Sequence, residues 1–352
     1  MTLNATSPPE YHPSGPGLDE WFAFIDSKFR PEFQIAAKNY VQQLLNNRLP
    51  AIFDLTHLGL CVGLDRGALM MMTHNPRAFY RVYEIPKRSG GTRQITAPMP
   101  SLLQAQRWIL RYILKNRPLA DSVHGFRSGR SIVSNGNAHL GARCVLKIDI
   151  RDFFPSVRAA RVLDVFDRMG YRTELTKDLT SLCTLNNQLP QGAATSPALA
   201  NIVARNLDLR LEGLASKFSL RYTRYADDLT FSGRLMSLEL PAVIAHIVED
   251  EGFVVNEEKT RLMRGSSRKI VTGISVGSGS AHLPRETRRK LKAELYSVLK
   301  YGPMSHLERR GIHDPQFIQR LLGRVSFWLQ IEPEEPFARR AHRTLSEFLA
   351  AP

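Results

Sequence analysis

Apolar residues recur at helical spacing at both ends of the sequence. They do so between Asp19 and Leu60, and again from Pro284 to the end, with interruptions around Gly302-Pro303 and Asp314-Pro315. This spacing predicts packing helices in both regions. Residues 1–17 are instead rich in Pro, Gly and Ser, and we expect them to form a loose tail.

The middle of the sequence alternates between strand-like and helix-like segments. Residues 80–98 read as two strands around Gly90-Gly91, where positive φ angles fit a tight turn. Residues 145–149 form an apolar strand that ends in a carboxylate, and residues 218–232 form a second hairpin with Tyr225–Asp228 at its tip. Helices are expected over 102–114, 156–169 and 241–251. Another is expected to start with Ser196 as its N-cap and Pro197 at its first position, with a buried stripe of Leu199, Val203, Leu207, Leu211 and Leu214.

The composition is that of a folded, strongly basic protein. The 352 residues include 48 Lys and Arg against 33 Asp and Glu, a net charge of +15, which favours a polyanionic partner such as nucleic acid over a membrane. We find no apolar run long enough to span a membrane and no secretory signal. Three scattered cysteines exclude a disulfide framework and a Cys-built zinc site, so we expect the reducing environment of a cytoplasm.

Three carboxylates stand out against this basic background. Asp149 ends an apolar strand, and Asp227 and Asp228 are adjacent at a hairpin tip. Adjacent acids repel each other unless a cation or solvent neutralises them. If the strand of Asp149 lies beside the hairpin, the three form an all-oxygen site suited to two Mg²⁺ ions. The alternative is that the Asp-Asp pair merely satisfies a turn.

The wider sequence resembles reverse transcriptases over about residues 80–330. The successive blocks that match, in order, are 80–98, 123–131, 145–157, 188–201, 222–233 and 252–262. The specific motifs are IDIRDFF at 148–154, LPQG at 189–192 followed by Ser196-Pro197, YADD at 225–228 and GFVVNEEK at 252–259. The resemblance implies an α+β right-hand polymerase with fingers, a palm of antiparallel sheet backed by helices, and a helical thumb. The expected parts are a tail (1–17), N-terminal helices and fingers (18–145), a palm (146–275, with finger parts at 160–195) and a thumb (276–352).

The resemblance also implies roles for individual residues in a two-metal nucleotidyl transfer. Asp149 and Asp227 would be the principal ligands of two Mg²⁺ ions, for which Mn²⁺ can substitute, with Asp228 and the backbone carbonyl of Ile150 completing the set. Lys259 would protonate the departing pyrophosphate or serve only as a phosphate-facing surface lysine. The residues expected to bind the deoxynucleoside triphosphate are Lys87 and Arg93 on the phosphates, Phe154 as the steric gate, and Gln191, Gly192 and Ala226 around the pocket. Phe153 is expected in the core.

Two short motifs narrow the resemblance to retron reverse transcriptases. Residues 135–139 read NGNAH, which resembles the Asn-Ala-x-x-His block of those enzymes with Gly136 in place of Ala. Residues 271–273 read Val-Thr-Gly, their second block. The resemblance of the first motif implies that Asn135 contacts RNA. His139 is expected to be a hydrogen-bonded residue that braces the helix of Asn135.

The basic residues are concentrated beside the second of these motifs. Residues 259–292 hold ten basic residues and one acidic residue, a net +9, where a nucleic-acid duplex would leave the palm. Phe327 and Trp328 are expected to be packing residues. The residues predicted to contact RNA are Asn135, His139, Arg268, Lys269, Val271, Thr272, Gly273, Arg288, Arg289 and Lys290.

These observations predict a retron RNA-directed DNA polymerase. By resemblance, it would bind a structured noncoding RNA of the msr–msd type, prime from an RNA 2′-hydroxyl, and make a branched RNA–DNA (msDNA) that acts with an effector or toxin protein in anti-phage defence. The alternatives are a group II intron-like or other defence-associated reverse transcriptase, and a non-catalytic RNA-binding scaffold. A scaffold or a ribosome-associated protein has no need for clustered acids.

Overall fold

The computed structural model describes residues 17–86, 90–311 and 313–350, so most of the expected tail lies outside the described residues. Two compact units are present. The first comprises the described residues up to Ala120, with Arg151–Leu207 and Glu251–Phe253, and the second comprises the remainder. Among the described residues, no helix combines the length and apolar character of a membrane span. The expected division into tail, fingers, palm and thumb follows other boundaries and stays a prediction.

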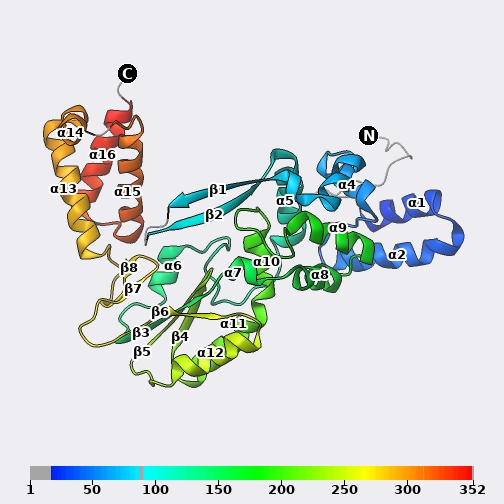
Figure 1. The fold of residues 1–352 in the computed structure, drawn as a ribbon, viewed down its shortest axis with the longest axis horizontal. Coiled ribbons are helices and arrows are strands. Elements are labelled where there is room, and N and C mark those ends of the chain that lie inside the picture. Colours follow the sequence, from blue (N-terminus) through cyan, green and yellow to red (C-terminus); the bar gives the residue numbers. More distant parts are fainter. Residues whose placement is uncertain (1–16, 87–89, 312, 351–352) are drawn as a thin grey trace. The chain divides into compact units, whose positions relative to one another are not determined.

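Four helices open the first unit, as the helical spacing predicts. Aspartates cap two of them, because the Asp54 carboxylate accepts a hydrogen bond from the His57 amide at 2.8 Å and the Asp65 carboxylate accepts one from the Ala68 amide at 2.9 Å. The apolar face of the first helix is buried through Trp21. In Figure 1 these helices are α1 (Leu18–Lys28), α2 (Pro31–Asn46), α3 (Leu55–Val62) and α4 (Arg66–His74).

The basic hairpin of the first unit is present where the sequence predicts it. A 3₁₀ turn, η1 (Pro76–Phe79), leads into β1 (Tyr80–Pro86), which pairs antiparallel with β2 (Thr92–Pro98). Gly90 and Gly91 have φ angles of 90° and 77°, which confirms their positive-φ turn. The helix predicted over 102–114 is also present, as α5 (Pro100–Ile109) continued by the π-helical turn η2 (Leu110–Leu114).

The helix predicted over 156–169 starts later than expected. A separate turn, α7 (Phe153–Ser156), is followed by an extended Val157, and α8 runs from Ala159 to Arg168. The extended segment pairs with a later one, because the Leu189 amide donates to the Val157 carbonyl at 3.1 Å and the Ala159 amide donates to the Asn187 carbonyl at 3.1 Å. The unit is completed by α9 (Thr173–Cys183) and α10 (Ser196–Val203).

The single helix predicted from Ser196 is wrong in two respects. Thr195 is the N-cap, while the Ser196 hydroxyl donates to the Pro190 carbonyl at 2.8 Å. The helix also ends at Ala204, whose ψ of 2° leaves the helical range, and α11 (Arg205–Lys217) then follows. Because the break shifts the buried face, Leu199, Leu207 and Leu211 are buried whereas Val203 and Leu214 are only half-buried.

A four-stranded antiparallel sheet forms the centre of the second unit, in the order β4-β5-β3-β6 (Figure 1). The central strand β3 is buried along almost its whole length, as its apolar run predicts. The predicted hairpin is confirmed as β4 and β5, and the predicted helix at 241–251 is α12, which contacts β6. The bounds are β3 (Cys144–Ile150), β4 (Arg221–Tyr225), β5 (Asp228–Gly233), β6 (Val255–Met263) and α12 (Leu240–Asp250).

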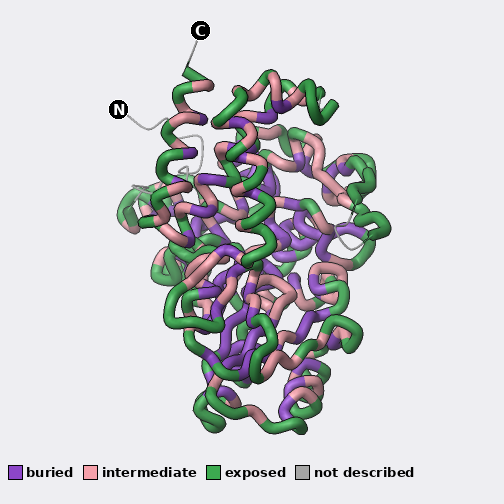
Figure 2. Tube along the Cα trace, turned by 90° about the vertical axis from the view of Figure 1, so that its left-hand side faces the viewer, coloured by how far each residue is buried: buried purple, intermediate pink, exposed green. Residues whose placement is uncertain are grey.

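The C-terminal helices of the second unit enclose an apolar core. The predicted interruptions are confirmed, because α13 ends before Gly302 and α15 begins at Phe317. Trp328 is fully buried, which confirms its packing role, and the same core includes Val271 and Val145. Figure 2 shows buried positions recurring between exposed ones within helices. The helices are α13 (Arg285–Tyr301), α14 (Pro303–Arg310), α15 (Phe317–Ile331) and α16 (Pro336–Ala350).

His139 joins the hairpin of β4 and β5 to α6, the helix that precedes β3. It follows α6 (Ile132–Asn137) and is fully buried. Its Nδ1 lies 2.7 Å from the Ser232 hydroxyl on β5, and its Nε2 lies 2.7 Å from the Thr223 hydroxyl on β4. The hydrogen-bonded histidine that the sequence predicts is therefore present, and it holds two strands as well as the helix.

We expect stability to fall as the pH drops below the ordinary histidine range. Burial lowers the pKa of His139 to about 3, with help from Arg221 and His124, against about 6.5 in an unfolded chain. Below pH 6.5 the unfolded state therefore binds a proton that the folded state lacks. Between those two pKa values, His139 alone should lower the free energy of unfolding by about 1.4 kcal/mol for each unit by which the pH falls.

Denaturant titrations between about pH 7 and 5 measure this slope. His124, whose pKa burial lowers to about 4, contributes in the same direction. His139→Gln should flatten the slope, whereas His313→Gln, at an exposed position, should not. A slope in His139→Gln equal to that of the wild-type protein would contradict this account.

Candidate active site and nucleic-acid interface

Strand pairing brings the three predicted carboxylates together. Asp149 is paired directly with Asp228 across β3 and β5, and side chains of directly opposed residues lie on the same face of an antiparallel sheet. Asp227 is held beside this pair, because the Ile150 amide donates to the Asp227 carbonyl at 2.9 Å. The strand that ends in Asp149 therefore lies beside the YADD hairpin, as the sequence predicts.

Basic and amide groups surround these acids. The Lys259 ammonium donates to both carboxylate oxygens of Asp149, at 3.0 and 3.1 Å, and the Asn256 amide donates to one of them at 3.2 Å. The Lys147 ammonium lies 3.5 Å from the Asp228 carboxylate. The hydrogen bond to Asp149 raises the pKa of Lys259, so its ammonium is held in the protonated form. Lys259 keeps 61% of its side chain exposed, and a negatively charged substrate can reach it.

The carboxylate cluster has the chemistry of a divalent-cation site. Burial raises the pKa of Asp227, and the charges of Asp149 and Asp228 raise it further. A divalent cation would relieve this repulsion, and carboxylate oxygens are the ligands that Mg²⁺ prefers. Within residues 17–86, 90–311 and 313–350, no group of three or more His, Cys, Asp or Glu is arranged to hold a metal ion. In the described arrangement the Lys259 ammonium is the cation at Asp149.

A close backbone contact that the sequence did not predict supports the YADD turn. Ala226 has a φ of 57°, in the left-handed region that residues with a Cβ rarely adopt. A Cβ on Gly125 would lie 2.5 Å from the Ala226 amide nitrogen, so only glycine fits there. The adjacent His124 amide donates to the Arg224 carbonyl at 2.8 Å. The only sequence signal was the position of Gly125 inside the matched block 123–131.

The other residues predicted to bind nucleotide belong to the first unit. Arg93 is exposed, Gln191 is half-buried, and Lys87 lies outside the described residues. Gly192 lies against the backbone of β2: its φ is 134° and an added Cβ would lie 2.7 Å from the Thr96 carbonyl oxygen. The Thr96 amide also donates to the Gln191 carbonyl at 2.8 Å. The LPQG loop is therefore fastened to the basic hairpin.

Two neighbouring residues support this part of the first unit. Phe153 is buried against Phe253 with ring centroids 5.7 Å apart, which confirms its packing role, and the half-buried Phe154 ring lies 5.6 Å from Phe153. Gln106, which the sequence did not indicate, is fully buried: its amide donates to the Tyr80 hydroxyl at 2.8 Å and its carbonyl accepts from the Ala194 amide at 3.1 Å. It joins the basic hairpin to the segment after LPQG.

The two motifs that narrow the resemblance meet in space. The Asn135 amide donates to the Thr272 hydroxyl at 3.3 Å, and that hydroxyl donates to the Ile132 carbonyl at 3.0 Å. Gly136 faces Ile274, whose side-chain carbons would lie 3.1–3.2 Å from an added Cβ, so the glycine lets the two elements pack closely. Thr272 has a φ of 45°, an unusual value for a β-branched residue. It lies between the short strands β7 (Ile270–Val271) and β8 (Ile274–Ser275).

The residues predicted to contact RNA divide by exposure. Asn135, His139, Lys269 and Val271 are buried, and the Lys269 ammonium donates to the Gly265 carbonyl at 2.7 Å. Thr272 and Arg288 are half-buried. The exposed members, which can reach a polyanion without rearrangement, are Arg268, Gly273, Arg289 and Lys290.

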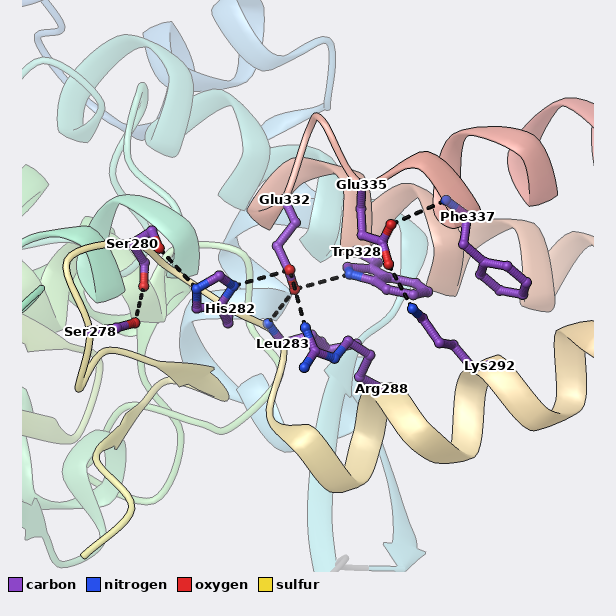
Figure 3. A network of polar contacts seen from close by, with 10 residues as sticks. All are labelled: Ser278, Ser280, His282, Leu283, Arg288, Lys292, Trp328, Glu332, Glu335 and Phe337. Atoms are coloured by element: carbon purple, nitrogen blue, oxygen red, sulfur yellow. Dashed lines mark hydrogen bonds and ion pairs between the residues drawn. The ribbon is translucent and has the colours of Figure 1, made fainter. Parts of the chain in front are cut away.

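Glu332 ties the segment after the Val-Thr-Gly motif to the C-terminal helices (Figure 3). Its carboxylate accepts from the Leu283 amide at 2.9 Å and from the Trp328 indole at 3.0 Å. It also lies 3.1 Å from the His282 ring and 3.5 Å from the Arg288 guanidinium. Burial alone would raise the pKa of Glu332, but these donors hold it below its usual value. Arg288 is thus engaged within the protein.

Comparison with known proteins identifies the class. The model of the reverse transcriptase (RNA-dependent DNA polymerase) family matches residues 85–292, more than half of the chain. The chain therefore belongs to the reverse transcriptases, which use divalent metal ions and bind nucleic acid.

Two relatives specify the kind of reverse transcriptase. The retron Mx65 reverse transcriptase of Myxococcus xanthus is 38% identical over 362 aligned positions, which cover 92% of this chain and 82% of the relative. The retron Ec86 reverse transcriptase of Escherichia coli is 32% identical over 312 aligned positions, which cover 88% of this chain and 92% of the relative. The protein is thus a retron reverse transcriptase, and the predicted family and α+β polymerase fold are confirmed.

Solved structures resemble the chain only distantly. A foamy viral protease–reverse transcriptase bound to double-stranded DNA gives a TM-score of 0.40 at 19% identity, covering 70% of this chain and 35% of the other. Telomerase from Candida albicans gives a TM-score of 0.43 at 10% identity, covering 77% of this chain and 63% of the telomerase chain. The assignment rests on the sequence matches.

Gly125→Ala should impair DNA synthesis while leaving the protein folded. The added methyl must displace the Ala226 backbone, and a misplacement of about 1 Å at reacting groups can cost on the order of 10²-fold in rate. Steady-state dNTP incorporation and thermal melting measure the two effects. The control is Gly213→Ala, on α11, where nothing lies within 4 Å of the added Cβ. Equal rates for the two variants would refute a role for Gly125 at the turn.

Proposed function

We propose that this reverse transcriptase copies part of a structured noncoding RNA of the msr–msd type, priming from an RNA 2′-hydroxyl and yielding a branched RNA–DNA. The observation that carries the proposal is the contact between the two motifs at Asn135 and Thr272. Thr272 belongs to the basic stretch 259–292, in which Arg268, Arg289 and Lys290 are exposed. The retron relatives support it. Sequencing of nucleic acid that co-purifies with the protein from its native host tests it directly, because a branched product is diagnostic.

The catalytic roles proposed for the palm follow from the donor set. Asp149, Asp227 and Asp228, with the Ile150 carbonyl, would hold Mg²⁺ or substituting Mn²⁺, and the ions when bound would activate the attacking hydroxyl and stabilise the leaving pyrophosphate. Lys259 is protonated and largely exposed, so it can donate a proton to pyrophosphate or hold its charge. Ala226 and the Gly125 contact set the conformation of the turn.

The roles proposed for the first unit concern the deoxynucleoside triphosphate. Arg93 and Lys87 supply positive charge for the phosphates. Gln191 and Gly192 form part of the nucleotide pocket, and their loop is fastened to β2 through Thr96. Phe154 excludes a ribose 2′-hydroxyl by contact with its ring.

The roles proposed in RNA binding follow exposure. Arg268, Gly273, Arg289 and Lys290 contact the RNA, while Asn135, His139, Lys269 and Val271 position the motifs from within, and Thr272 and Arg288 lie at the boundary. The RNA–DNA product would act with an effector or toxin protein in anti-phage defence in the bacterial cytoplasm. Support for that setting comes from the retron relatives and from the three scattered cysteines.

Asp227→Asn should abolish DNA synthesis, with a loss on the order of 10³-fold or more, because it removes a metal-binding charge. RNA affinity should be unchanged or higher, since one repulsive charge is lost. Primer extension and fluorescence anisotropy measure the two quantities. Asp178→Asn is the matched control, because burial also raises the pKa of Asp178, which lies on α9. Wild-type synthesis by Asp227→Asn would rule out the metal assignment.

Replacing Arg289 and Lys290 with Ala should weaken RNA binding and flatten its dependence on salt. Each phosphate contact contributes about 0.7–0.9 to the slope of log K against log salt concentration. Anisotropy titrations at several salt concentrations measure the slope. Replacement of Arg168 and Lys177 with Ala is the control, because both are exposed residues in surface ion pairs, as Lys290 is with Glu286. An unchanged slope in the Arg289–Lys290 variant would place the RNA elsewhere.

A further inference from the structure

A buried ion pair adjoins the YADD turn. Arg224, at the end of β4, and Asp208, on α11, are both 0% exposed. Two parallel hydrogen bonds join them: Nε to Oδ1 at 2.7 Å and Nη2 to Oδ2 at 2.7 Å. This bidentate geometry fixes the guanidinium plane as well as its charge.

The Asp208 carboxylate has a further hydrogen-bond partner. The Tyr222 hydroxyl donates to Asp208 Oδ1 at 2.9 Å, so the carboxylate accepts three hydrogen bonds. Burial would lower the pKa of Arg224, but the Asp208 carboxylate outweighs it and raises that pKa. Burial and the same carboxylate raise the pKa of Tyr222, which therefore stays a donor.

The remaining arm of the guanidinium reaches the turn itself. Nη1 of Arg224 donates to the Ala226 carbonyl at 3.2 Å, and Ala226 is the residue with a left-handed φ of 57°. The Arg224 backbone is fixed at the same time, because its amide donates to the Ser122 carbonyl at 2.8 Å and its carbonyl accepts from the His124 amide at 2.8 Å. The Arg224 side chain therefore holds the peptide bond between Ala226 and Asp227, and the Arg224 backbone holds the end of the strand that leads to it.

An ion pair of this kind is a poor source of stability alone, because apolar residues of similar volume often replace a buried pair without loss. Its geometry fits orientation better, since a planar fork holds a strained carbonyl where an apolar side chain would not. We propose that Arg224, fixed by Asp208, is a positioning residue for DNA synthesis: it holds the Ala226 carbonyl and thereby sets the orientation of Asp227 and Asp228. This inference rests on the metal-binding role proposed for those two carboxylates.

The test removes the pair without leaving a buried charge. In the double variant Arg224→Met with Asp208→Leu, thermal melting and affinity for poly(rA)·oligo(dT) should stay close to wild type. The kcat for dTTP incorporation should fall on the order of 10²-fold with little change in KM, and the Mg²⁺ concentration for half-maximal rate should rise several-fold. Arg224→Lys, which keeps the charge but loses the fork, should move kcat and the Mg²⁺ requirement in the same direction.

The chain offers a matched control on the same helix. Arg210, on α11, pairs with Asp250 at 2.7 Å, but both side chains are about 40% exposed. Arg210→Gln with Asp250→Asn should leave kcat and the Mg²⁺ requirement unchanged, because this pair is exposed to solvent and the Ala226 carbonyl accepts its hydrogen bond from Arg224.

Two outcomes would overturn the proposal. The first is a double variant with wild-type kcat and Mg²⁺ requirement. The second is a variant whose lost activity tracks its unfolded fraction and returns on cooling, which would make the pair merely structural. Failure of the proposed metal site shows itself separately, as an Asp227→Asn enzyme that still synthesises DNA.

Discussion

The pairing of β3 with β5 is the constraint on which the palm depends, because it sets Asp149 directly opposite Asp228 with Asp227 alongside. Carboxylates gathered in this way repel each other, and burial of Asp227 adds to the cost of ionising all three. The surroundings compensate with the ammonium groups of Lys259 and Lys147. A basic chain thus gathers three acids at one end of the two central strands of a sheet, where a cation is the natural complement.

Much of the fold could be predicted because its signals are local. Strand-like runs and turn chemistry located the hairpin with Tyr225–Asp228 at its tip, and helical spacing located the C-terminal helices with their breaks. The break at Ala204 and the extended Val157 could not be predicted, because Val157 pairs with a segment far along the chain and the break carries no glycine or proline. Local propensity is silent about such long-range contacts.

The candidate site was predictable to a similar degree and for similar reasons. Its carboxylates stand in motifs whose order and spacing are recognisable in the sequence. Gly125 and Arg224 were missed because each acts through a contact with Ala226, and a single glycine or arginine has no periodic pattern to reveal it. Burial was equally hidden: the sequence treats Lys269 and Arg268 alike, yet one ammonium is enclosed by backbone carbonyls and the other side chain is exposed.

The six residues of α6 and the histidine just beyond them support two different parts of the enzyme. Asn135 donates a hydrogen bond to the Val-Thr-Gly loop, and His139 is hydrogen-bonded to both strands of the YADD hairpin. In the roles proposed above, RNA choice and chemistry therefore depend on one scaffold. If α6 is redesigned to accept a foreign RNA, slower DNA synthesis is therefore the expected side effect. Changes at the exposed residues Arg289 and Lys290 leave α6 and its contacts intact.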